Sequence, residues 1–368
     1  MRIRAYADLH LFKDKETMNR YISEELNDLI MKLMNDPPDM LIFAGDLTHT
    51  SYQSDDIRFL ETIKFITKVV TICETNKIYF RMIQGTASHD GKIVEMLKTL
   101  FIDSKYCRFF TSVAYEDFNG YIIRYLPESY FGTYSEFQSY AFDKPADMTF
   151  FHGSVDGVIP YVKQKDSITN LPKSIVIQQK DLINNTRLFS AGGHIHQHIN
   201  LQDKIFYINS LTTMSFSDID NIKGYMEFTL DKYDWDWIYV PNYNAPKYLD
   251  FIIENIHMKP LEEMKSILSN LLLKVSSKDY IRFTITGERN STGLANLSLL
   301  KTYVKKYNIK IKTEMNDTEL EEKLTDDINY YTDKSVSNID KIKRLASDLY
   351  GVDLEDEEIE RMIFNDNK

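Results

Sequence analysis

Short apolar runs alternate with longer amphipathic stretches over the first part of the chain. The runs at 2–7, 40–44 and 78–83 are short and bounded by polar residues, which indicates buried strands. Between them, about 16–34 and 55–73 carry apolar residues at helical spacing. A strand-helix-strand-helix-strand order predicts parallel strands joined by right-handed crossovers. The residues that follow these strands should therefore meet at one edge of a sheet.

The pattern continues with a helix at about 91–101 and strands near 120–126, 205–208, 224–230 and 235–240. We expect these strands to complete two packed sheets with helices on their outer faces. The predicted fold class is therefore α/β, in the form of a two-sheet sandwich flanked by helices.

A second domain and a tail should follow the sandwich, which we place at 1–240. The segment 241–246 contains two prolines and two asparagines and has the composition of a linker. Strand and helix patterns then alternate over 247–313, which predicts a small α/β domain. The remainder, 314–368, reads as a tail of short acidic helices. Within it, apolar positions recur at near-helical spacing over 335–350 and again over 353–364.

The charge of the chain is concentrated in this tail. The whole sequence has a net charge of −11, but 314–368 alone holds 17 acidic and 7 basic residues. The rest is nearly neutral, so local basic patches that bind nucleic acid are not excluded. Two cysteines are too few for a disulfide framework. No signal peptide or membrane-spanning run is apparent, so we expect no membrane association and a cytoplasmic location, or the host cytoplasm if the source is viral.

Histidines and aspartates recur at the ends of the predicted strands. Of eight histidines, seven precede residue 200, and six of those follow a strand-like run. Asp8 and Asp46 lie at the first two of these strand ends. In layered α/β proteins ligands gather at such edges. Imidazole and carboxylate without thiolate suit a borderline divalent metal ion, so the sequence predicts a metal site there.

The order of these motifs resembles that of the calcineurin-like metallophosphoesterases. The matching segments are Asp8-Leu9-His10, Gly45-Asp46-Leu47-Thr48-His49, His89-Asp90, His152-Gly153 and Gly193-His194-Ile195-His196. Two further features point to one family within this superfamily. They are the histidine three residues after Asp46 and the segment Tyr207-Ile208-Asn209-Ser210 followed by Phe216. These features are similar to the SbcD family of DNA double-strand-break repair and recombination nucleases, which includes phage nuclease subunits. The motifs cover about 1–240, and only the layout of elements matches beyond.

This resemblance implies a metallophosphoesterase sandwich that holds two divalent metal ions, with manganese supporting activity. Asp46 matches the aspartate that bridges the two ions in the family. Asp8, His10 and His196 would complete the first metal site, and His152 and His194 would belong to the second. Two such ions lie about 3.5–4 Å apart, where they neutralise phosphate charge and activate water.

The resemblance also implies roles for three residues that do not bind metal. His89 corresponds to the histidine that contacts the scissile phosphate and can protonate the leaving oxygen. Asp90 would hold the other ring nitrogen of His89 and fix its tautomer. We expect His49 to face the substrate, and the alternative is a structural histidine beneath the loop.

One segment departs from the family pattern. The family usually has Gly-Asn-His-Asp, in which the asparagine oxygen binds the second metal. Here Gly85-Thr86-Ala87-Ser88-His89-Asp90 contains two additional residues. Ser88 precedes His89 as the asparagine would, so we expect its hydroxyl to be the ligand. Thr86 or a water molecule remains an alternative.

The family resemblance predicts macromolecular partners as well as DNA. SbcD-type nucleases pair through helices near the front of the nuclease domain, so 16–34 and 55–73 are candidates for a homodimer surface. The domain at 247–313 would correspond to the DNA-capping domain. The tail would bind the coiled coil of an SMC-like ATPase, and the alternative is that it packs on its own domain.

Two other functions are compatible with the same core. The first is a small-molecule phosphodiesterase or phosphatase, although such minimal enzymes end soon after the Gly-His-x-His segment. The second is an inactive scaffold subunit, which only the altered segment around Ser88 favours. The leading prediction is a metal-dependent DNA nuclease, with exonuclease or endonuclease activity, that acts in repair and recombination.

Overall fold

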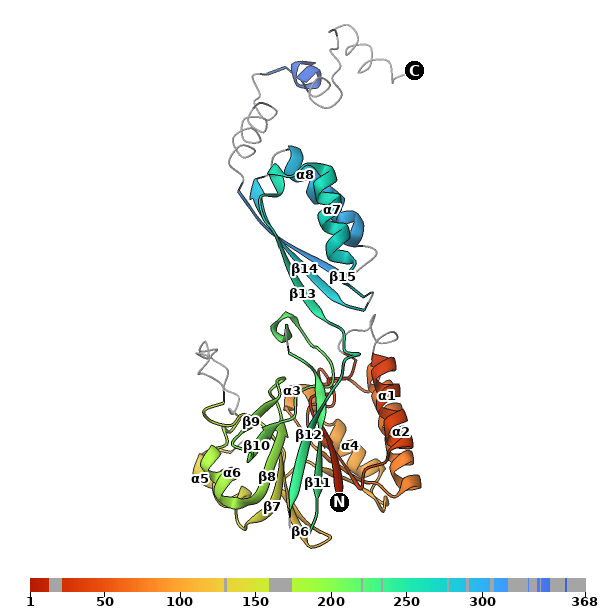
Figure 1. Ribbon diagram of the computed structural model, residues 1–368, viewed down its shortest axis with the longest axis vertical. Helices are drawn as coiled ribbons and strands as arrows, with labels where there is room; N and C mark the ends of the chain where they lie inside the picture. Colours follow the sequence, from red (N-terminus) through yellow and green to blue (C-terminus); the bar gives the residue numbers. More distant parts are fainter. Residues whose placement is uncertain are drawn as a thin grey trace. The chain divides into compact units, whose positions relative to one another are not determined.

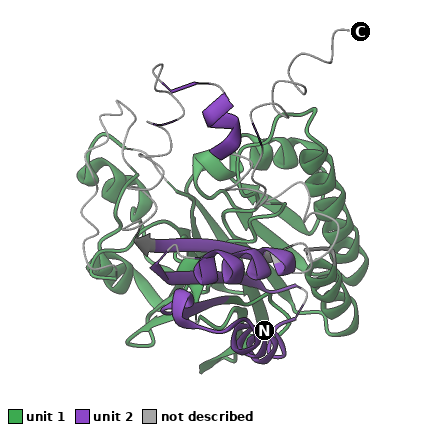
Figure 2. Cartoon of the chain, turned by 90° about the horizontal axis from the view of Figure 1, so that it is seen from above, with its two compact units in different colours: residues 1–248 green, residues 249–368 purple. Residues whose placement is uncertain are grey.

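The computed structural model divides the chain into two compact units, Met1–Tyr248 and Leu249–Lys368 (Figures 1 and 2). It describes residues 1–12, 22–128, 131–158, 174–219, 221–232, 234–276, 278–288, 291–304, 308–316, 330, 336–337, 339–344 and 355.

The first sheet of unit 1 has six strands in the order β12-β11-β1-β2-β3-β4. Their bounds are β1 (Arg2–Tyr6), β2 (Met40–Ala44), β3 (Tyr79–Ile83), β4 (Cys107–Phe110), β11 (Gly224–Leu230) and β12 (Trp235–Pro241). The strands β1 to β3 are parallel, as the sequence pattern predicts. β4 adds a fourth parallel strand, and β11 and β12 add an antiparallel edge. The carboxyl ends of the first three strands therefore meet at one edge.

Helices cover the outer face of this sheet. They are α1 (Ile22–Asn35), α2 (Ile57–Asn76) and α4 (Ile93–Leu100). The apolar face of α1 is buried through Leu29, Ile30 and Leu33, at the helical spacing seen in the sequence. The side chain of Asp56 caps the start of α2, and Lys77 ends it in the left-handed conformation. The predicted start of α1 at residue 16 falls outside the described residues.

The second sheet also has six strands, in the order β5-β6-β7-β8-β10-β9. Their bounds are β5 (Ala114–Phe118), β6 (Tyr121–Leu126), β7 (Ala146–His152), β8 (Thr186–Gly193), β9 (Ile199–Leu201) and β10 (Ile205–Tyr207). Two helices, α5 (Tyr134–Ala141) and α6 (Gln179–Asn185), contribute Phe137 and Leu182 to the core on one face of this sheet. A capping box of Thr133 and Glu136 begins α5.

The opposite face of the second sheet packs on the first sheet. The core between them includes Ile42 from β2, Phe150 from β7 and Phe189 from β8, all fully buried. The layers are therefore helix, sheet, sheet and helix, which confirms the predicted α/β sandwich (Figure 1). Short helices α3 (Ala87–Asp90) and η2 (Phe216–Asp218) lie in connections of this unit.

Unit 2 contains a three-stranded sheet in the order β13-β14-β15. The elements are β13 (Tyr248–Ile253), η3 (Ile256–Met258), α7 (Leu261–Leu272), β14 (Tyr280–Glu288), α8 (Ser291–Val304) and β15 (Asn308–Asn316). Ile281, Phe283 and Ile285 alternate along β14 and are buried in a core with both helices. The strand β15 continues to Asn316, three residues beyond the predicted boundary at 313.

Most of the tail lies outside the described residues. A helical segment is described at 339–344, within the predicted helix 335–350. The second predicted tail helix, 353–364, is described only at one residue. Within the described residues, no helix has the length and apolar character needed to span a membrane.

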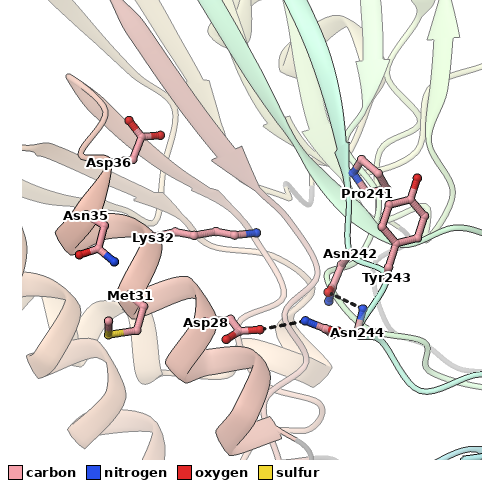
Figure 3. A pocket seen from close by; sticks show the side chains of 9 residues that line it. All are labelled: Asp28, Met31, Lys32, Asn35, Asp36, Pro241, Asn242, Tyr243 and Asn244. Atoms are coloured by element: carbon pink, nitrogen blue, oxygen red, sulfur yellow. Dashed lines mark hydrogen bonds between the residues drawn. The ribbon is translucent and has the colours of Figure 1, made fainter.

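A hollow of about 520 Å³ lies in unit 1 between α1 and the residues that follow β12 (Figure 3). Asp28, Lys32 and Asp36 of the α1 region line it with Asn242 and Asn244. The side-chain amide of Asn244 donates to Asp28 at 3.2 Å. The lining includes no histidine, so this hollow offers no imidazole ligand for a metal ion.

A buried ion pair joins the two sheets of the sandwich. Arg81 on β3 and Glu116 on β5 form a two-bond contact at 2.6 and 2.7 Å, with side chains 1% and 8% exposed. Tyr125 donates a further hydrogen bond to Glu116. Burial opposes ionisation of Glu116, but the Arg81 guanidinium outweighs it and lowers the pKa of this carboxyl.

We expect Glu116→Ala to lower the free energy of unfolding by about 3–5 kcal/mol, because it leaves the Arg81 charge buried without its partner. The double variant Arg81→Met with Glu116→Leu should lose less. The pKa of Glu116 is lower in the folded chain than in the unfolded chain, where it is about 4.3. The stability that the ion pair contributes is therefore fully present above that pH and is lost as the pH falls through the folded pKa. Urea unfolding of the three proteins at pH 7 and in mild acid measures this. A single variant as stable as the native chain would contradict it.

Candidate metal centre

The candidate site is built on unusual backbone conformations at the strand ends. Asp8, His10, Asp46 and His194 all have positive φ angles, of 49°, 43°, 49° and 95°. Non-glycine residues rarely adopt this region, and such strain often occurs at functional sites. Hydrogen bonds between neighbouring strand ends hold the turns, including Asp8 N to Gly45 O at 3.1 Å. The chain therefore maintains a costly local geometry around these side chains.

Two glycines allow the strand ends to approach one another. Gly45 has a φ of +84°, and a Cβ atom there would lie 2.1 Å from Nδ1 of His152. A Cβ on Gly85 would lie 2.2 Å from the backbone nitrogen and Oδ1 of Asp46. Neither position has space for a side chain unless a site residue moves.

The predicted ligands come together in space. The described part of the chain contains three groups in which side-chain donor atoms lie within 4.8 Å of one another. These groups are Asp8 with His10 and His196, Asp46 with His152 and His194, and His10 with His49 and His89. Groups of this composition can hold a metal ion.

Asp46 belongs to the group with His152 and His194 and also faces His10 of the group with Asp8. Its Oδ1 is 3.3 Å from Nε2 of His152, and its Oδ2 is 3.8 Å from Nε2 of His10. The Thr86 backbone N–H donates to Oδ1 at 2.6 Å. Burial opposes ionisation of Asp46, but the charge of His152 outweighs it and lowers the pKa of this carboxyl. Asp46 is therefore an anion with one oxygen turned toward each group.

Second contacts orient the ligand atoms of the site. Nδ1 of His152 lies 2.9 Å from the Ala44 carbonyl oxygen, which leaves Nε2 directed at Asp46. Burial disfavours the imidazolium, yet Asp46 and Asp8 raise the pKa of His152 to about 10. Both oxygens of Asp8 accept from the His194 backbone N–H, at 2.9 and 3.1 Å. Burial, with a smaller contribution from Asp46, raises the pKa of Asp8 to about 7.

The imidazoles of His10 and His196 face each other directly. Their Nε2 atoms are 2.9 Å apart. Burial and the neighbouring His196 lower the pKa of His10 well below its usual value, and burial with Lys223 lowers that of His196 to about 4. Two neutral imidazoles whose nitrogens point at one spot, beside buried carboxylates, fit a divalent cation.

His89 and Asp90 are not paired as the sequence suggested. Nδ1 of His89 contacts the carbonyl oxygen of His49. Asp90 instead accepts three backbone N–H groups, from Leu47, Thr48 and Gly85. The prediction that Asp90 fixes the His89 tautomer is therefore wrong, because a main-chain oxygen takes that position. Asp90 joins the two loops that carry Asp46 and His89.

The expectation for Ser88 is also corrected. Ser88 lies on α3 with an exposed side chain, and its backbone oxygen accepts from Ser51. The hydroxyl of Thr86 instead lies 3.4 Å from Oδ2 of Asp46 and 3.5 Å from Nε2 of His152. Of the two residues considered, Thr86 therefore lies beside Asp46 and His152, and Ser88 does not.

Sequence reasoning missed the buried lysine that supports the histidine loop. Lys223 is 1% exposed, and its Nζ donates to the backbone oxygen of His196 at 2.8 Å. The same ammonium contacts Oδ1 of Asn209 at 3.2 Å and Oδ1 of Asp218 at 3.1 Å. Lys223 is not part of any recognised motif. The only signal in the sequence is its position one residue before the strand that begins at Gly224. It joins three segments behind His196.

No family model matches the chain. Among solved structures, one chain aligns with 12% sequence identity and a TM-score of 0.37, over 65% of this chain and 98% of that one. A likeness at this level identifies neither fold nor function, so the functional assignment depends on the site residues.

We predict that Thr86→Val raises the manganese concentration needed for half-maximal metal binding, because it removes the hydroxyl beside Asp46 and His152. Loss of a group that contacts the ligands typically weakens metal affinity by about 10–100-fold. Ser88→Ala is the matched control and should leave the titration unchanged. Calorimetric titration of the metal-free chain measures both, and the opposite order of effects would restore Ser88 as the ligand.

Proposed function

We propose that this chain is a metal-dependent DNA nuclease of the SbcD type. The observation that carries the proposal is the position of Asp46, whose two oxygens face two different imidazole groups. A carboxylate shared in this way suits two neighbouring cations, and two-metal sites are typical of enzymes that hydrolyse phosphodiesters. Asp8, His10 and His196 would hold one cation, and His152 and His194 would hold the other with Thr86 beside them.

Cations held there would supply neutralisation of phosphate charge and a nucleophile at neutral pH. We propose manganese for both positions, which the mixed imidazole and carboxylate donors support. The chain's own task is to keep those donors oriented before the substrate arrives. Hydrogen bonds from the backbone at His194 and Thr86 to the two aspartates support that role.

His89 is the proposed general acid. Its Nδ1 is engaged by the His49 carbonyl, so Nε2 is the atom left to face the site, 4.0 Å from Oδ2 of Asp46. The side chain is 29% exposed, which allows contact with a phosphodiester from solution. In the imidazolium form Nδ1–H would donate to the His49 carbonyl, and Nε2–H would protonate the leaving oxygen and so return His89 to the neutral imidazole. The ring of His49 is half-buried, and its centre lies 5.9 Å from the centre of the His89 ring. His49 would contact the substrate beside His89.

The test compares Asp46→Ala with His89→Ala. We expect Asp46→Ala to lose both metal binding and cleavage, because the shared carboxylate is gone. His89→Ala should keep its metals and lose rate by about 10²–10⁴-fold, the usual contribution of general acid catalysis. The assay is manganese-dependent degradation of linear duplex and single-stranded DNA, with metal content measured in parallel.

The outcomes separate the three candidate functions. Cleavage of small phosphodiesters without cleavage of DNA would favour the small-molecule enzyme. Metal binding without either activity would favour the scaffold. A His89→Ala variant that is fully active would contradict the assigned role of His89.

An apolar surface on α1 and α2 supports a homodimer. Met31, Met34 and Leu60 are 51%, 53% and 47% exposed on these helices. A groove of about 430 Å³ between them is lined by Met34 together with Ile63 and Ile72. Exposed apolar side chains clustered in this way mark interaction sites. Pairing through these helices is the arrangement that the SbcD resemblance implies.

We further propose that the acidic tail binds an SMC-like ATPase. The tail is predicted to contain two short amphipathic helices on a charged segment. Such helices bury little apolar surface by themselves, which favours their binding to a partner protein. A chain ending at Asn316, where β15 ends, should retain manganese-dependent nuclease activity but lose co-purification with the ATPase. Retained binding would exclude the tail, and loss of nuclease folding would indicate that the tail packs on its own chain.

A further inference from the structure

His10, His49 and His89 form a group that the proposed nuclease mechanism does not use as a metal site. Their ring centres are 5.5 Å apart for His10 and His49, and 4.8 Å apart for His10 and His89. Each offers a nitrogen within 4.8 Å of the others. Unlike the other two groups, this one contains three imidazoles and no carboxylate of its own.

Two details direct Nε2 of His10 and Nε2 of His89 at a common space. Nε2 of His10 and Nε2 of His89 lie 3.8 and 4.0 Å from the same oxygen of Asp46. The carbonyl of His49 engages Nδ1 of His89, which leaves Nε2 available.

We propose that His10, His49 and His89 form a further cation position, selective for zinc. Imidazole donors favour zinc over manganese, because zinc lies above manganese in the general affinity order and manganese is better suited by oxygen ligands. His10 belongs to both this group and the group with Asp8, so the two positions compete for its imidazole.

This position regulates the proposed nuclease and in that respect rests on the proposed function. Zinc bound to His89 occupies the nitrogen that would donate a proton to the leaving oxygen. It also draws His10 away from the first metal site. Zinc should therefore inhibit manganese-dependent cleavage, whereas additional manganese should not.

The test titrates the metal-free full-length chain separately with zinc chloride and with manganese chloride in a calorimeter. His49→Asn should weaken zinc binding by at least about tenfold, because one imidazole of three is lost. Manganese binding should stay within about twofold, since His49 is in neither carboxylate-containing group. His257→Asn, in unit 2 and outside all three groups, is the matched control and should change neither. In cleavage assays, His49→Asn should raise the half-inhibitory zinc concentration by a similar factor.

Unchanged zinc affinity in His49→Asn would overturn the proposal, as would equal losses for zinc and manganese. If His49→Asn does not fold, as judged by circular dichroism, X-ray absorption on the native chain with one zinc per molecule decides. Three imidazoles on zinc support the position, and two overturn it. A zinc-selective loss in a chain that does not cleave DNA would remove the nuclease and leave the cation position intact.

Discussion

The buried carboxylate of Asp46 is the interaction on which the site depends. It is 2% exposed, remains an anion despite burial, and turns one oxygen to His152 and the other to His10. A buried charge is costly unless it is paired and hydrogen-bonded. Here the Thr86 backbone N–H and the surrounding imidazoles provide that compensation. The arrangement leaves a set of inward-facing nitrogens that a cation can use.

The rest of unit 1 keeps this arrangement in place. Parallel strands bring Asp8 and Asp46 to one edge, and β7 and β8 of the second sheet bring His152 and the His194 loop to the same place. The glycines at 45 and 85 permit contacts that any side chain would block. Behind the histidine loop, Lys223 ties His196 to the segment before β11. The apolar core between the sheets thus supports a polar and strained site at its rim.

Hydrophobic spacing predicted the first three strands of unit 1 and the helices between them, because their apolar residues recur at strand or helical spacing. It did not predict the short elements β4, β5, β9, α5 and α6. The run at 40–44 matches β2 in full, and the parallel order follows from the crossovers. The three-residue extension of β15 to Asn316 was missed because Glu314 and Asn316 are polar and interrupt the apolar pattern.

Side-chain partners were harder to predict than strand ends. Asp90 was assigned to His89 because they are adjacent in sequence, yet Asp90 accepts from the backbone amides of Leu47 in the Asp46 loop and of Gly85 in its own loop. Ser88 was preferred over Thr86 because it precedes His89, and an insertion inside a helical turn cannot be located by counting residues. Lys223 is joined to His196 by a contact across 27 positions, which no local pattern reveals.

The magnetic behaviour of the manganese-loaded chain tests most directly the proposal that two cations share the Asp46 carboxylate. Two Mn²⁺ ions about 3.5–4 Å apart are close enough to couple magnetically. Electron paramagnetic resonance of the native chain with two manganese ions per molecule should therefore give a coupled spectrum, and Asp46→Ala should abolish it. Spectra of isolated, uncoupled manganese in the fully loaded native chain would contradict the account.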